Sequence, residues 1–67
     1  MATNRTLVQT PRLAQLRKDA LMSQQELARA AEVGKNTIHR LENGGTAFPE
    51  TARKLAKALG VDIRNLL

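Results

Sequence analysis

The chain has 67 residues, which allows one domain with a small core. It has no cysteine and one histidine, so neither a disulfide framework nor a thiolate or all-histidine metal site can support the fold. The net charge of +5 favours a polyanionic partner, either nucleic acid or an anionic membrane. Phe48 is the only aromatic residue, which argues against stacking of single-stranded bases. No stretch is long and apolar enough to span a bilayer and no signal-peptide core opens the chain, so we expect a cytoplasmic location and no membrane contact.

The N-terminal residues carry few apolar side chains. We expect residues 1–9 to form a flexible arm and residues 10–67 to form the domain. Thr10 followed by Pro11 predicts a helix start, with threonine as the N-cap and proline in the first helical position. Apolar residues then recur at helical spacing, so the first helix is expected over residues 11–20.

The second helix has the clearest local start signal in the chain. Ser23 and Glu26 have the spacing of a capping box, in which each residue satisfies a backbone N–H of the other. Met22, just before the cap, can pack on Leu27 as a hydrophobic staple. These signals predict a short helix over residues 24–31.

A third helix is predicted over residues 35–43. Ile38 and Leu41 lie three positions apart and belong to its buried face. Gly44 and Gly45 follow and are expected to end it, because glycine accepts the left-handed conformation found after many helices.

Two further helices complete the expected fold. Phe48 precedes Pro49, and a residue before proline is disfavoured in helical conformation, so a helix should begin at the proline and run over residues 49–59. Gly60 caps its end, and Asp62 caps a last short turn. No segment has a strand signal. The sequence therefore predicts an all-α, compact five-helix bundle.

The second and third helices are separated by only three residues, Glu32 to Gly34. So short a joint forces the two helices to cross steeply, which is the geometry of a helix-turn-helix. The third helix then turns a continuous polar stripe outward, whose side chains can hydrogen-bond to base edges or phosphates. The stripe consists of Lys35, Asn36, His39, Arg40 and Asn43.

The stretch SQQELARAAEVGKNTIHRLENG resembles the helix-turn-helix of the phage repressor and Cro-like family, also called the xenobiotic-response-element family. With its flanks, RKDALMSQ before it and LAKALGVDI after it, the resemblance covers nearly all of residues 11–67. It implies a lambda-repressor-like five-helix bundle that binds operator DNA, usually as a dimer.

The resemblance also implies roles for individual residues. Arg17 and Glu42 match a buried ion pair that ties the first helix to the third. Base contacts are implied for Lys35, Asn36, His39 and Arg40, and backbone contacts for Gln24, Thr37 and Asn43. Thr46 is an added backbone-contact candidate, because it is the obvious side-chain donor in the loop before the fourth helix.

Three positions depart from the family pattern. Glu32 stands where the family usually has glycine, so a left-handed conformation there would cost about 1–2 kcal/mol. Gly34 replaces the usual Ser or Thr cap of the third helix. The loop G-T-A-F-P-E lacks the basic phosphate contacts that some relatives place there.

These features predict a sequence-specific, double-stranded DNA-binding transcriptional regulator, and the resemblance favours a repressor that binds a palindromic operator as a homodimer. The alternative is a protein-interaction module or an antitoxin-type partner-binding domain with the same fold, and RNA binding stays open. An enzyme is not expected, because the sequence shows no nucleophile–base set, phosphate-binding glycine loop or metal-ligand cluster. We expect no cofactor, no metal and no small-molecule substrate.

Overall fold

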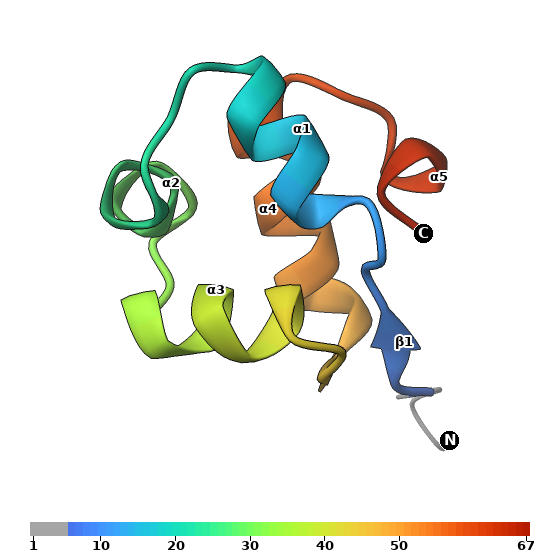
Figure 1. Ribbon diagram of the computed structural model, residues 1–67. Helices are drawn as coiled ribbons and strands as arrows, with labels where there is room; N and C mark the ends of the chain where they lie inside the picture. Colours follow the sequence, from blue (N-terminus) through green and yellow to red (C-terminus); the bar gives the residue numbers. More distant parts are fainter. Residues whose placement is uncertain (1–5) are drawn as a thin grey trace.

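Apolar side chains from five short helices meet in one core in the computed structural model, which describes residues 6–67. Figure 1 shows α3 at the bottom, below α2 and α4, with α1 at the top and α5 at the right above β1. The elements in chain order are β1 (Val8–Gln9), α1 (Leu13–Asp19), α2 (Gln24–Ala31), α3 (Lys35–Glu42), β2 (Thr46–Ala47), α4 (Pro49–Leu59) and α5 (Ile63–Leu66). The expected five-helix fold is confirmed, with a minor two-stranded sheet added.

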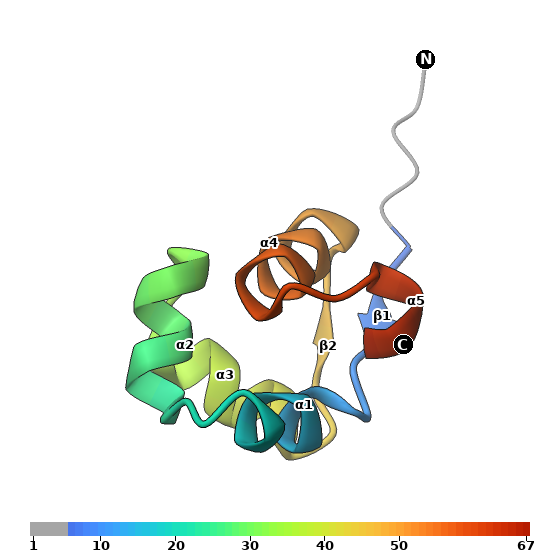
Figure 2. The same cartoon turned by 90° about the horizontal axis from the view of Figure 1, so that it is seen from above.

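Helix α2 is central to the packing because it contacts both α3 and α4. Figure 2, seen from above, places α2 and α4 side by side, with α1 near the N-terminal end of α2. Each helix supplies at least one side chain to the core, since leucines, isoleucine and alanines recur on its inward face. The buried members are Leu13, Leu27, Ala28, Ala31, Ile38, Leu41, Ala47, Ala52, Leu55, Ala56 and Leu66.

The capping box at the start of α2 is present. The Ser23 hydroxyl accepts a hydrogen bond from the Glu26 N–H (3.0 Å), and the Ser23 N–H donates to Glu26 Oε1 (2.7 Å). Met22 packs against the core to which Leu27 belongs. The observed bounds of α2 agree with those expected, because these signals are local and complete.

The expected start of the first helix is wrong. Helix α1 begins at Leu13, with Arg12 as N-cap, and Pro11 lies in the turn before it. Thr10 contributes its carbonyl oxygen to this turn, accepting from the Leu13 N–H (3.0 Å), while its side chain is buried. Burial of Thr10 beside β1 orients the chain here, so tertiary packing overrides the local cap signal.

Two short strands also depart from the prediction, which contained none. Val8 pairs with Ala47 and Gln9 with Thr46 in an antiparallel ladder. Strands of two residues are too short to produce an alternating pattern in the sequence. The end of the expected arm is therefore paired with the chain that follows α3, while residues 1–5 of that arm lie outside the described residues.

The remaining helix ends follow the expected chemistry with small shifts. Helix α3 ends at Glu42, one residue earlier than predicted, and Asn43 is its C-cap. Gly60 ends α4 in the left-handed conformation (φ 70°), and the Asp62 carboxylate accepts from the Arg64 N–H (2.8 Å) at the start of α5. Leu66 is buried, whereas Leu67 is 45% exposed.

Candidate nucleic-acid interface

The joint between α2 and α3 fixes the angle at which α3 meets the core. Glu32 adopts the left-handed conformation (φ 58°, ψ 43°), which costs a residue with a Cβ about 1–2 kcal/mol. The turn closes through the Val33 N–H, which donates to the Ala28 carbonyl oxygen (3.0 Å). Ala28 is buried on α2, which packs against both α3 and α4, so its small side chain leaves room for close packing of these helices.

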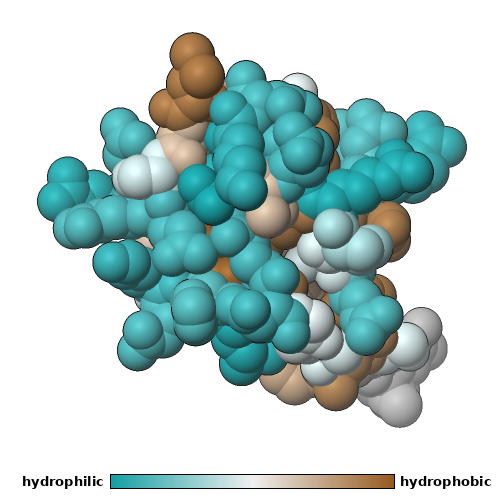
Figure 3. Space-filling view, viewed as in Figure 1, coloured by the Kyte–Doolittle hydropathy of each residue, from teal (hydrophilic) through white to brown (hydrophobic). Residues whose placement is uncertain are grey.

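The outward face of α3 is polar and exposed. Ile38 and Leu41 are buried and fasten the helix to the core, which leaves the intervening positions on the surface. Lys35, Asn36 and His39 are fully on that surface. Figure 3 shows a largely hydrophilic surface on the side viewed in Figure 1, including the region of α3. The structure thus brings three of the predicted base-contacting residues onto one accessible face.

The C-terminal end of this face is arranged differently. Arg40 is exposed, but its Nη1 donates to the carbonyl oxygen of Thr46 (2.7 Å), which draws the guanidinium towards the loop after α3. Asn43 Nδ2 donates to the carbonyl oxygen of His39 (2.7 Å), so this amide closes the last turn of its own helix. Thr37 is half-buried.

Arg17 and Glu42 form an ion pair between α1 and the end of α3. Arg17 Nε lies 2.6 Å from Glu42 Oε2, and Nη2 lies 3.1 Å from Oε1, with the two side chains only 12% and 8% exposed. Arg17 Nη1 also donates to the Met22 carbonyl oxygen (2.9 Å), a contact that no sequence pattern indicated. The pair therefore joins α1, the α1–α2 turn and α3.

Gln24 joins the same network from the start of α2. Its Nε2 donates to Glu42 Oε1 (3.0 Å), so the predicted phosphate-contacting amide is oriented by a carboxylate. The hydrogen bonds from Arg17, and with a smaller effect from Gln24, lower the pKa of Glu42 despite its partial burial. The same carboxylate raises the pKa of Arg17. A second N–H of the Gln24 amide is left for another acceptor.

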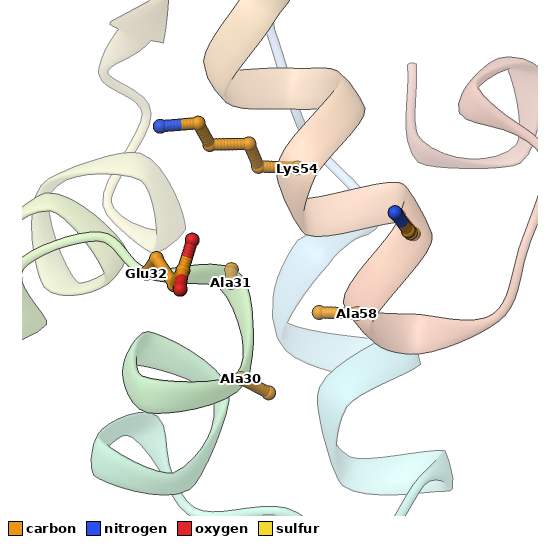
Figure 4. Close-up of a pocket in the computed structure, with 6 residues that line it drawn as sticks. Ala30, Ala31, Glu32, Lys54 and Ala58 are labelled. Carbon is orange, nitrogen blue, oxygen red and sulfur yellow. The ribbon is translucent and has the colours of Figure 1, made fainter.

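A shallow pocket of about 330 Å³ lies between the end of α2 and the second half of α4. Figure 4 shows Ala30, Ala31 and Glu32 on one side of it and Lys54 and Ala58 of α4 on the other. Its lining consists of Ala30, Ala31, Glu32, Lys54, Lys57 and Ala58. This set contains no serine, threonine, cysteine or histidine. Over residues 6–67, no group of three or more His, Cys, Asp or Glu side chains is placed to hold a metal ion.

Across the described chain, no helix is long and apolar enough to cross a membrane.

Two short helices that meet at a tight left-handed turn, the second exposing cations and amides, define a helix-turn-helix domain. A helix-turn-helix family model matches residues 13–66. The chain therefore belongs to the Cro/C1-type helix-turn-helix family, the xenobiotic-response-element family, whose members are DNA-binding transcription regulators. Searches of curated proteins and of solved structures gave no significant match.

Proposed function

We propose that this domain reads operator sequence in double-stranded DNA by inserting α3 into the major groove, and that it acts as a repressor. The observation that carries the proposal is the exposed face of α3. Lys35 suits the acceptors of guanine, Asn36 can pair with adenine through two hydrogen bonds, and His39 can donate or accept. The major groove, about 12 Å wide, admits a helix with such side chains.

Backbone contacts would set the register of α3 in the groove. We assign them to Gln24, Thr37, Asn43 and Thr46. Gln24 supports this role best, because its bond to Glu42 fixes the amide beside the first turn of α2, where backbone N–H groups attract anions. Such contacts make the affinity fall as the salt concentration rises.

The proposal includes a homodimer on a palindromic operator. Half-sites would lie about 10–10.5 base pairs apart, one helical turn, so that two copies of α3 face the same side of the duplex. Leu67, 45% exposed at the end of α5, offers an apolar contact for a second copy. Repression would follow where the operator overlaps a promoter. The proposed location of the protein is the cytoplasm, together with the DNA that it binds.

Selection of binding sites from a random duplex pool tests this function. The wild type should enrich a palindrome, and Asn36→Ala should lose preference at particular base pairs, because it removes one base-reading amide. Gln15→Ala is the matched control, since Gln15 is an exposed amide on α1, outside the proposed DNA and dimer contacts. Salt-sensitive binding without an enriched sequence would contradict the proposal and favour an interaction module.

A further inference from the structure

The loop after α3 is interlocked with Arg40. The guanidinium donates from Nη1 to the Thr46 carbonyl oxygen (2.7 Å), while the Gly45 N–H donates to the carbonyl oxygen of Arg40 itself (2.9 Å). Arg40 therefore contacts the loop through both its side chain and its backbone. We call this arrangement the Arg40 clasp.

Gly45 is glycine here because of space. A Cβ at this position would lie 2.8 Å from the Arg40 carbonyl oxygen and 2.9 Å from both Arg40 Cγ and Nη1, all shorter than real Cβ contacts. Its φ is not in the left-handed region, unlike that of Gly44 (94°). The missing side chain at Gly45 is what lets the arginine lie across the loop.

The clasped segment is also held from its other side. Thr46 belongs to β2 and pairs with Gln9 of β1, and the neighbouring Ala47 is buried in the core. The segment directly after α3 is therefore fixed between the Arg40 side chain and β1. The bond from Nη1 to the Thr46 carbonyl oxygen holds the guanidinium beside this loop, and the N–H groups that it leaves over project from there.

We propose that Arg40 is a positioning residue, which holds the loop between α3 and β2 in place for contact with the DNA backbone, and that it does not read bases. This inference rests on the proposed function. Base reading then belongs to Lys35, Asn36 and His39, in the first five positions of α3. The clasp makes the position of Thr46, a proposed backbone contact, depend on Arg40.

The test compares Arg40→Met and Gly45→Ala on the selected operator and on its single-base variants. Gly45→Ala keeps the arginine charge but obstructs the clasp, so it separates position from charge. Each change should weaken binding about three- to tenfold, which is the effect expected from loss of one hydrogen bond. The factor should be the same on every single-base variant of the operator. The double variant should bind less weakly than the product of the two single effects predicts, because both changes break the same side-chain contact, while the Cβ at residue 45 still meets the backbone carbonyl of residue 40. Lys35→Met, the matched loss of a cation from the same helix, should instead alter preference at one base pair.

Relaxed preference at one base pair in Arg40→Met, with preference intact in Gly45→Ala, would overturn the inference and leave the proposed function standing. A wild type without any sequence preference would instead refute the proposed function. Amide hydrogen exchange of the free protein provides a second readout, independent of DNA and of whether Gly45→Ala folds. Residues 44–47 should exchange faster in Arg40→Met than in Lys35→Met, and equal rates would also overturn the clasp.

Discussion

Replacement of Glu42 by glutamine keeps the shape of the side chain and removes the charge that faces Arg17. The arginine would remain between α1 and α3 without its counter-charge. The two side chains are only 12% and 8% exposed. The free energy lost on removing one partner should therefore approach that of a fully buried ion pair, about 3–5 kcal/mol. Glutamine can still accept one hydrogen bond from Arg17, so we expect the free energy of unfolding to fall by about 2–4 kcal/mol.

That loss is large for a domain of this size, whose total stability is on the order of 3–10 kcal/mol. Urea unfolding at neutral pH, followed by circular dichroism of the helices, measures it directly. Glu32→Gln is the matched control, because Glu32 is exposed and the same charge is removed there. A loss below about 1 kcal/mol for Glu42→Gln, the range of surface pairs, would refute the assignment of a buried ion pair.

Glu42→Gln should also change how the free energy of unfolding depends on pH in the acidic range. The pKa of Glu42 is lowered in the folded state, so its contribution is fully present above the ordinary carboxyl pKa of 4.5 and is lost as the pH falls through the folded value. Glu42→Gln should therefore lose less stability than the wild type on acidification from neutral pH. Parallel curves for the two proteins would contradict this reasoning.

Four further substitutions test local features by the same unfolding assay. Thr10→Val should raise stability by about 1–2 kcal/mol, because the buried Thr10 Oγ1 has no hydrogen-bond partner in the described chain; a loss would indicate that the hydroxyl is bonded. Leu21→Gly and Glu32→Gly should each raise the melting temperature, since both residues are left-handed (φ 59° and 58°) and exposed, and a decrease would mean that the strain is smaller than the entropy cost of glycine. Ser23→Ala should cost about 1 kcal/mol through loss of the capping box, and an unchanged midpoint would show that the cap is redundant.

Local chemistry made most helix ends predictable. Ser23 and Glu26 satisfy each other within one turn, and Gly60 ends α4 by its own conformational freedom, so a short window of sequence contains the whole cause. Thr10 has an equally good cap signal, yet α1 begins at Leu13. The cause there is the pairing of β1 (residues 8–9) with β2 (residues 46–47). The two strands lie too far apart in the sequence for any local window to contain both.

In the candidate site, too, some features were predictable from local sequence and others were not. Helical periodicity is enough to predict that Lys35, Asn36 and His39 face outward, because Ile38 and Leu41 must face the core. The direction of the Arg40 side chain was not predictable, since its acceptor is a backbone carbonyl that has no sequence signature. In the sequence, Gly45 indicates only the end of a helix. The structure shows that a side chain at this position would collide with Arg40.

Leu21 and Glu32, the two non-glycine residues with left-handed φ within residues 6–67, stand at the two joints that flank α2. For an amino acid of the opposite chirality, this backbone region is the relaxed one. A chemically synthesised chain with D-leucine and D-glutamate at these two positions would keep both side-chain types and lose the steric strain. It would also avoid the freedom that glycine adds to the unfolded chain. The orientation of α2 and α3 is therefore set at joints where the chirality of a single residue can be changed by synthesis.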